Sequence, residues 1–236
     1  MKSWTLAGLL VAAPVAALGA APAAAQNWNA TYEATQQGHR LGNPEADIRL
    51  IEFISYTCPH CASFERESEA ELRYFYVHEG HASIEVRHII RNIVDVAAAL
   101  TTECGPAENF YGNHRAMLST QDEWLGRARA LSPAQLARWD AGDFGSRMRA
   151  IASDLDWYEL MEPRGYSATQ LDACLSDQSR ADAIVATANA NAREYGVQGT
   201  PSFAVNETLL AEVHGWPQLR LALTGMRQGA AEPIVD

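Results

Sequence analysis

The chain is poor in positive charge. Lys2 is the only lysine in 236 residues, and 18 basic side chains stand against 29 acidic ones, for a formal net charge of −11. Nucleic acids and anionic membranes are bound through clustered positive charge. The composition therefore argues against both classes of partner, and the acidic surface by itself indicates no other.

Cysteine is also scarce, with four in the chain. Cys58 and Cys61 form a Cys-x-x-Cys motif, but no second such motif and no His-x-x-x-His lies nearby, so a zinc site would lack its usual four ligands. We expect no metal here. Half of a zinc site and a purely structural disulfide are the alternatives to a redox-active pair.

Long apolar runs are absent beyond the first residues. Met1-Lys2 leads into the apolar stretch Leu6 to Ala20, and Ala23-Ala24-Ala25 fits signal cleavage between Ala25 and Gln26. We expect residues 1–25 to be a signal peptide and the mature chain to be exported to the periplasm, where disulfides persist. A retained membrane anchor is the alternative, although the run is short for a bilayer span.

Cys58-Pro59-His60-Cys61 is the most informative motif in the chain. It follows the strand-like run Ile48 to Tyr56 and precedes apolar residues at helical spacing from Ala62 to Val77, so it should open a helix. The helix dipole favours an anion at that position. Pro59 suits the first helical turn, and His60 can add positive charge. We expect Cys58 to be the exposed attacking thiolate and Cys61 the more buried resolving thiol.

Strand and helix patterns divide the rest of the chain. Strands are predicted at Tyr32–Gln36 and Ser83–Ile90, with a turn-rich connection at Gly38–Pro44. From Val94 to Tyr195 only helical spacing recurs, which predicts an inserted block of four to six helices. Within the block, Ser132 and Ser167 each precede a glutamine by three residues and should begin helices. A hairpin from Pro201 to Val213 and a helix from Trp216 to Arg227 follow.

Two segments, Phe53 to Cys61 and Val197 to Phe203, carry a resemblance to a known family. With the order of elements above, the chain resembles DsbA proteins over essentially its whole mature length. The resemblance implies an α/β architecture, a thioredoxin fold with an inserted all-helical domain. The two parts of the thioredoxin fold would be residues 26–93 and 196–236, and the helical insertion would be residues 94–195.

The resemblance also implies a role for Thr200-Pro201. In similar proteins this peptide bond is cis and faces the redox pair. Pro201 has no N–H to donate, and the backbone of Thr200 can pair with an extended substrate strand. An ordinary turn before a strand is the alternative. The best-known oxidase of the family has valine before the proline, whereas threonine is found in several isomerases and some oxidases.

Glu52 is a carboxylate in an otherwise apolar strand, and by resemblance it matches the family's buried acid beneath the active site. Desolvation would raise its pKa and let it exchange a proton with Cys61. A solvent-facing position on the strand is the alternative.

Cys104 and Cys174 lie near the two ends of the helical block. In an oxidising compartment the even count argues that they pair, and closing a loop of about 70 residues would stabilise the fold by roughly 4 kcal/mol. A second pair of this kind resembles DsbA proteins of α-proteobacteria. We expect a structural bridge. The alternative is a redox-regulatory pair that tunes Cys58.

Three functions remain open. The favoured one is a monomeric periplasmic thiol:disulfide oxidoreductase that donates its active-site disulfide to reduced exported proteins. A DsbB-type, quinone-linked membrane partner would reoxidise it. We expect no cofactor beyond that disulfide. The second is a disulfide isomerase or reductase kept reduced by a DsbD-type partner. The third is a thiol-dependent binding module without turnover.

Overall fold

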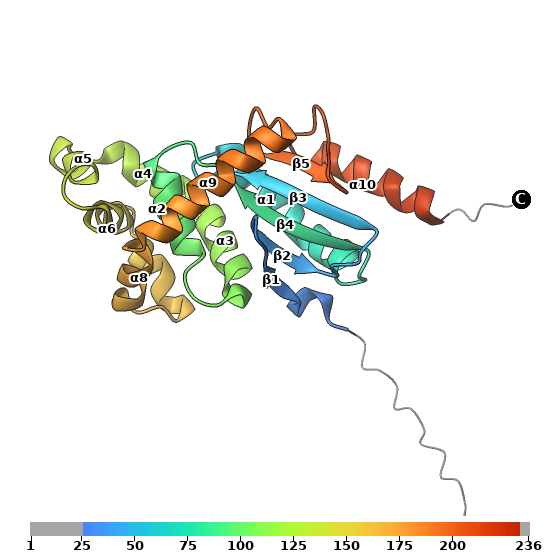
Figure 1. The fold of residues 1–236 in the computed structure, drawn as a ribbon, viewed down its shortest axis with the longest axis horizontal. Helices are drawn as coiled ribbons and strands as arrows, with labels where there is room; N and C mark the ends of the chain where they lie inside the picture. Colours follow the sequence, from blue (N-terminus) through green and yellow to red (C-terminus); the bar gives the residue numbers. More distant parts are fainter. Residues whose placement is uncertain (1–25, 232–236) are drawn as a thin grey trace, which may run out of the picture.

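The computed structural model describes residues 26–231. A sheet and a group of helices lie side by side along the long axis of the molecule (Figure 1). The predicted signal peptide and its cleavage site lie outside the described residues. No helix within residues 26–231 combines the length and the apolar character needed to cross a bilayer.

The sheet has six strands in the order β1-β2-β4-β3-β5-β6. They are β1 (Tyr32–Ala34), β2 (His39–Gly42), β3 (Ile48–Ile54), β4 (Ala82–His88), β5 (Ser202–Val205) and β6 (Thr208–Leu209). Strands β3 and β4 pair in parallel, and every other pairing is antiparallel. Parallel neighbours need a crossover connection, which here is the helix that follows the Cys-x-x-Cys motif.

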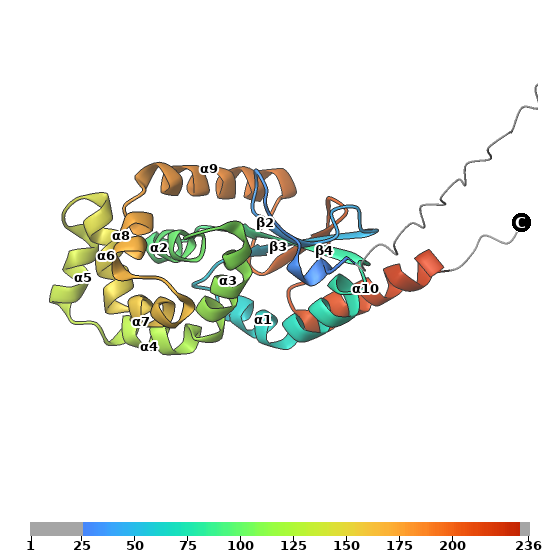
Figure 2. The same ribbon diagram turned by 90° about the horizontal axis from the view of Figure 1, so that it is seen from below.

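The helices fall into those that flank the sheet and those of the helical block. The α-helices are α1 (Pro59–Glu71), α2 (Ile93–Thr102), α3 (Phe110–Ser119), α4 (Gln121–Ala130), α5 (Pro133–Asp140), α6 (Phe144–Asp154), α7 (Trp157–Met161), α8 (Ala168–Leu175), α9 (Gln178–Tyr195) and α10 (Trp216–Ala231). A π-helical segment, Leu72–Val77, extends α1, and short 3₁₀ turns occur at Trp28–Ala30, Ala107–Asn109 and Glu162–Arg164. Helix α9 covers one face of the sheet, and α1 and α10 cover the other (Figure 2).

Strand β3 is apolar along most of its length because helices cover both of its faces. Leu50 packs in one cluster with Phe64 of α1 and Leu223 of α10. Ile51 and Phe53 point to the opposite face and pack in another cluster. This arrangement confirms the predicted α/β class and thioredoxin fold, with the Cys-x-x-Cys motif at the carboxyl end of a central strand.

One strand was missing from the predicted order of elements. The segment Gly38–Pro44, predicted to be a turn-rich connection, contains β2. Its residues pair with β4, His39 opposite Val86 and Gly42 opposite Ser83. Glycine and asparagine near this segment favour a turn locally, but pairing with a strand more than 40 residues away overrides that preference.

The helical block holds more helices than predicted. Between Ile93 and Tyr195 the chain forms eight α-helices, α2 to α9, rather than four to six. The excess arises at short breaks that apolar spacing does not mark. Thr120 alone separates α3 from α4, and two residues separate α6 from α7. The helix starts predicted at Ser132 and Ser167 are confirmed, and each forms a capping box.

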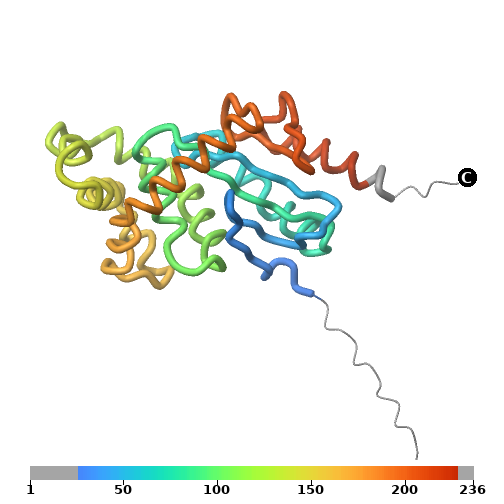
Figure 3. Tube along the Cα trace, viewed as in Figure 1, coloured from blue at the N-terminus to red at the C-terminus, as the bar shows by residue number. Residues whose placement is uncertain are grey.

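The middle of the chain forms the helical block, and the first and last parts form the sheet (Figure 3). The boundaries at residues 93/94 and 195/196 stay a prediction, since α9 packs against both α2 and β4. The two parts share a core: Tyr56 and Cys61 belong to the same buried cluster as Trp157 in the block. The redox motif therefore lies where the sheet meets the helices.

Candidate active site

Cys58 occupies the N-cap of α1, directly after the turn that leaves β3. Its backbone is extended, with φ −94° and ψ 115°, and Pro59 begins the helix. The carbonyl oxygen of Cys58 accepts from the N–H of Cys61 at 3.1 Å and of Ala62 at 3.4 Å. Both cysteines of the motif are free thiols in this structure. The sequence pattern thus predicted where α1 begins.

Burial differs from the expectation at Cys58. Cys61 is completely buried, as expected, but Cys58 is only 3% exposed, so its predicted exposure was wrong. The segment that contains Thr200 closes over it, and the Cys58 thiol donates to the Thr200 carbonyl oxygen at 3.1 Å.

The two thiols have opposite acidities. A hydrogen bond from the Cys61 side chain is the main reason that the pKa of Cys58 falls to about 5, against the opposing effect of burial. The Thr200 side chain and the backbone N–H groups of Cys61 and His60 lower it further. Burial raises the pKa of Cys61, and the hydrogen bond to Cys58 and the negative charge there raise it more. Cys58 is the thiolate of the pair and Cys61 its proton-bearing partner.

His60 lowers the pKa of Cys58 through its backbone N–H, and the positive charge expected from its side chain stays a prediction. The side chain is exposed. Pro59, also exposed, occupies the first helical position as predicted.

The Thr200-Pro201 bond is cis, the geometry that the resemblance implied. Thr200 influences Cys58 in two ways: the thiol donates to its carbonyl oxygen, whereas its side chain favours the thiolate. The carbonyl oxygen of Pro201 lies 2.9 Å from Nδ1 of His214, so this histidine contacts the loop that faces the redox pair.

Glu52 lies inside the protein, which excludes the solvent-facing alternative. It is 3% exposed, in the middle of β3, and lines a cavity of about 30 Å³ together with Glu65 and His114. Burial, and then the charge of Glu65, raise the pKa of Glu52 well above its usual range. Its surroundings therefore favour the protonated form of this carboxyl.

Two buried polar residues of the helical block also contact the redox turn, and the sequence analysis did not identify them. Asp95 accepts from the N–H of Thr57 at 2.9 Å, and the side-chain amide of Gln121 donates to the carbonyl oxygen of Cys58 at 2.9 Å. The only sequence feature that could have indicated Asp95 is its place as an acidic residue in the first turn of a helix. No sequence pattern distinguishes Gln121.

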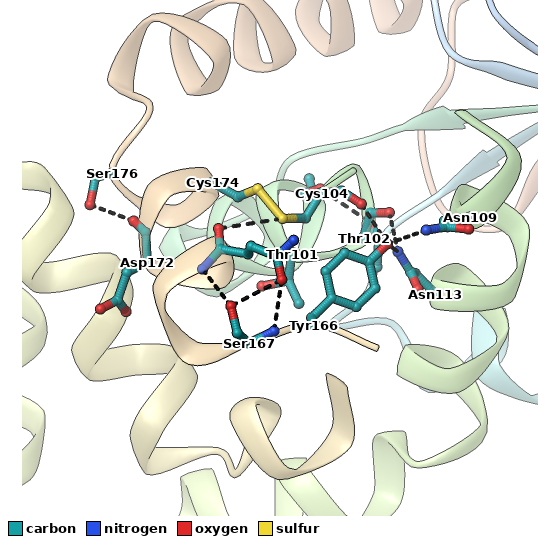
Figure 4. Close-up of a disulfide and its surroundings, with 12 residues drawn as sticks. Thr101, Thr102, Cys104, Asn109, Asn113, Tyr166, Ser167, Asp172, Cys174 and Ser176 are labelled. Carbon is teal, nitrogen blue, oxygen red and sulfur yellow. Dashed lines mark hydrogen bonds between the residues drawn. A yellow bond between two sulfur atoms is a disulfide. The ribbon is translucent and has the colours of Figure 1, made fainter. Parts of the chain in front are cut away.

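Cys104 and Cys174 form a disulfide (Figure 4). Cys104 lies two residues after the end of α2, and Cys174 lies in α8. The two Cα atoms are 5.7 Å apart. The Tyr166 hydroxyl donates to the Cys104 carbonyl oxygen at 2.7 Å and accepts from Asn113, so the bridge lies in a tightly bonded region of the block. Across residues 26–231, no three or more His, Cys, Asp or Glu side chains gather as a metal site would require.

Comparison with known proteins agrees with this geometry. A family model described as thioredoxin matches residues 34–224. The structure of a protein-disulfide isomerase from Novosphingobium aromaticivorans is similar, with 43% sequence identity, a TM-score of 0.76, and coverage of 80% of this chain and 97% of that chain. The alpha-DsbA1 structure from Wolbachia pipientis shares the fold, at 21% identity, a TM-score of 0.61, and coverage of 80% and 88%.

A curated relative from Rickettsia felis, named for protein-disulfide oxidoreductase activity, is 25% identical over 177 residues. The match covers 75% of this chain and 55% of the relative, so the chain spans about half the length of that protein. The family match over most of the chain and the dithiol at the start of α1 lead to one assignment: the chain belongs to the thioredoxin family.

Proposed function

We propose that this chain is a periplasmic protein disulfide oxidoreductase that donates a Cys58–Cys61 disulfide to reduced exported proteins. The observation that carries the proposal is the opposite acidity of the two thiols, with the pKa of Cys58 lowered to about 5 and that of Cys61 raised. A stabilised thiolate stabilises the reduced pair, and the disulfide is correspondingly a stronger oxidant.

The reaction proceeds by two thiolate attacks. A substrate thiolate attacks Sγ of Cys58, the Cys58–Cys61 bond breaks, and Cys61 leaves as a thiolate that takes up a proton. A second substrate thiolate then attacks the substrate sulfur of the mixed disulfide, and Cys58 leaves as a thiolate. The substrate loses two electrons and gains a disulfide, while the enzyme pair gains both electrons.

Two neighbouring groups serve these steps. Glu52, with its raised pKa, is the proposed proton donor to the departing Cys61 sulfur, and it accepts that proton back in the reverse direction. The backbone at Thr200 and Pro201 is the proposed substrate-binding edge, because an extended peptide can pair with exposed backbone there. No cofactor beyond the redox disulfide is required by this chemistry.

Export and the partner are part of the proposal. The apolar run Leu6 to Ala20 and the small residues before Gln26 support export to the periplasm. A pair that oxidises substrates must be reoxidised, for which we propose a DsbB-type, quinone-linked membrane protein. We propose that the chain works as a monomer.

A second candidate function is disulfide isomerisation or reduction, with the pair kept reduced by a DsbD-type partner. The observation in its favour is the 43% identity to the Novosphingobium protein named as a disulfide isomerase. Threonine before the cis proline fits either role.

The deciding experiment combines the reduction potential of the Cys58–Cys61 pair with insulin-reduction and scrambled-RNase assays. The Cys58→Ala variant is the inactive control. We expect an oxidising potential, rapid disulfide donation to a reduced peptide and weak isomerase activity. A reducing potential with strong isomerase activity would instead support the second function. Inactivity in every assay would overturn both and favour a binding module without turnover.

A further inference from the structure

The turn between β3 and α1 is held from outside by the helical block. Ser55, Tyr56 and Thr57 form this turn, and the N–H of Cys58 closes it by donating to the Ser55 carbonyl oxygen at 3.1 Å. These residues have no ladder partner in the sheet beyond Ile54. Two side chains, one from α2 and one from α4, instead bond the backbone of this turn, and the Tyr56 hydroxyl pairs separately with Nδ1 of His114.

Gln121, the first residue of α4, contacts the turn from one side. Its Nε2 donates to the carbonyl oxygen of Tyr56 at 2.6 Å and to that of Cys58 at 2.9 Å. The side chain is completely buried. One side-chain amide thus fixes the carbonyl groups of Tyr56 and Cys58, on either side of Thr57.

Asp95, in the first turn of α2, contacts the turn from the other side and is also completely buried. Its carboxylate accepts from the Thr57 N–H at 2.9 Å, the Thr57 hydroxyl at 3.1 Å and the Ser55 hydroxyl at 2.9 Å. The backbone N–H of Arg91 adds a fourth donor at 2.9 Å. The described residues provide no ion-pair partner for Asp95, so hydrogen bonds and the start of α2 balance its charge.

These contacts matter because the position of Cys58 depends on the turn. The thiolate is stabilised by short-range groups: the Cys61 side chain, the Thr200 side chain and two backbone N–H groups of α1. A hydrogen bond weakens steeply as distance and angle depart from ideal values. A displaced N-cap would therefore lose several stabilising contacts at once.

We propose that Gln121, acting with Asp95, is a positioning residue of the redox centre: it holds the Ser55–Cys58 turn so that Cys58 stays aligned with its hydrogen-bond donors. The helical block thereby contributes to the acidity of a thiol that belongs to the thioredoxin part of the fold. The inference rests on the proposed redox role of Cys58 but not on the direction of disulfide exchange.

The test uses Gln121→Met, which keeps the size of the side chain and removes both N–H donors. In the reduced protein we expect the pKa of Cys58 to rise by about one unit, because the thiolate loses alignment with its donors. The equilibrium constant between the Cys58–Cys61 pair and glutathione should change by up to tenfold. The reduction potential of the pair would then fall by up to about 30 mV, which makes it less oxidising. Thiolate absorbance against pH and redox titration measure the two effects.

Asn113→Leu is the matched control. Asn113 is also a completely buried amide whose Nδ2 donates to two oxygens, those of Thr102 and Tyr166, but both lie within the helical block. We expect it to destabilise the protein by a similar amount and to leave the pKa of Cys58 unchanged. An unchanged pKa in Gln121→Met, with the same loss of stability as the control, would overturn the inference.

Thr57→Val provides a second variant in case Gln121→Met does not fold. It removes the hydroxyl bonded to Asp95 and to Nδ2 of Asn92 while keeping the shape of the side chain. It should also raise the pKa of Cys58, by a smaller amount than Gln121→Met. An unchanged pKa of Cys58 in this variant would count against the inference. Because pKa measurement needs no substrate, a failed oxidase assay would reject the proposed function and leave this inference standing.

Discussion

At the scale of single residues, the lowered pKa of Cys58 comes mainly from a few directed hydrogen bonds rather than from exposure. The sulfur is almost completely buried, and burial alone would raise its pKa. The hydrogen bond from Cys61 is the largest opposing effect, so the proposed resolving cysteine lowers the pKa of the proposed attacking one. The same bond raises the pKa of Cys61.

Thr200→Val tests the contribution of the loop that covers Cys58. The valine side chain lacks the group that favours the thiolate, so the pKa of Cys58 should rise by roughly half a unit to one unit. Thiolate absorbance of the reduced variant against pH measures the change. Thr200→Ser, which keeps a hydroxyl, should restore most of the wild-type value; a Thr200→Val curve identical to wild type would show that the side chain plays no part.

Glu52→Gln tests the proposed proton donor. Formation of the mixed disulfide, in which Cys61 leaves and takes up a proton, should become slower without being abolished, since water can still supply that proton. Stopped-flow oxidation of a reduced peptide measures the rate. Rates equal to wild type would remove this role from Glu52.

The same variant has a predicted pH dependence. An acid whose pKa is raised on folding contributes stability that is complete below its unfolded pKa, roughly 4.3, and is lost as the pH rises toward the folded value. Glu52→Gln should therefore gain stability relative to wild type as the pH rises from 4 to 8. Urea denaturation at several pH values measures it, and a constant difference would mean that Glu52 keeps an ordinary pKa.

At the scale of elements, the start of each helix determines where functional groups lie. Cys58 caps α1, and Asn92 caps α2 by accepting from the N–H groups of Val94 and Asp95. The α2 cap sets the direction of Asp95, which in turn contacts the redox turn.

The capping boxes at Ser132 and Ser167 give a stability prediction at this scale. Each serine accepts from a backbone N–H three residues later, so Ser132→Ala and Ser167→Ala should each lower the free energy of unfolding by about 1 kcal/mol. Urea denaturation measures the loss, and the redox potential should not change. Serine-to-alanine changes without effect would show that these caps add no stability.

Local patterns were sufficient to predict some elements and not others. Strand β3, the start of α1 and both capping boxes depend on neighbours in the sequence, and the sequence analysis found them. Strand β2 depends on pairing with β4, and the contacts of Asp95 and Gln121 join residues 38 and 63 positions apart. Such contacts form only when the chain folds, so no local sequence pattern indicates them.

At the scale of the whole molecule, the thioredoxin part and the helical block share one core at the redox motif. Cys58 and Cys61 pack in the same cluster as residues of the block such as Met148 and Trp157. The block is thus part of the environment of the active site as well as a covering of it.

The Cys104–Cys174 bridge gives a prediction at this scale. It closes a separation of 70 residues, so the Cys104→Ala/Cys174→Ala double variant should lower the free energy of unfolding by about 2 to 4 kcal/mol. Denaturation of wild type and variant, each with the Cys58–Cys61 pair in the same redox state, measures the loss. A structural bridge should leave the pKa of Cys58 unchanged, whereas a clear shift would favour the regulatory alternative.

The central claim is that Cys58 is a stabilised thiolate at neutral pH, and the ultraviolet absorbance of that thiolate in the reduced protein, followed against pH, tests it most directly. Cys58→Ala identifies which sulfur titrates. A pKa depressed on folding stabilises the reduced protein fully above the unfolded value, roughly 8.5. This contribution declines as the pH falls and is lost below the folded value of about 5. The account predicts a titration near pH 5 that disappears in Cys58→Ala. A titration near that of an ordinary free thiol, at roughly 8.5, would contradict it.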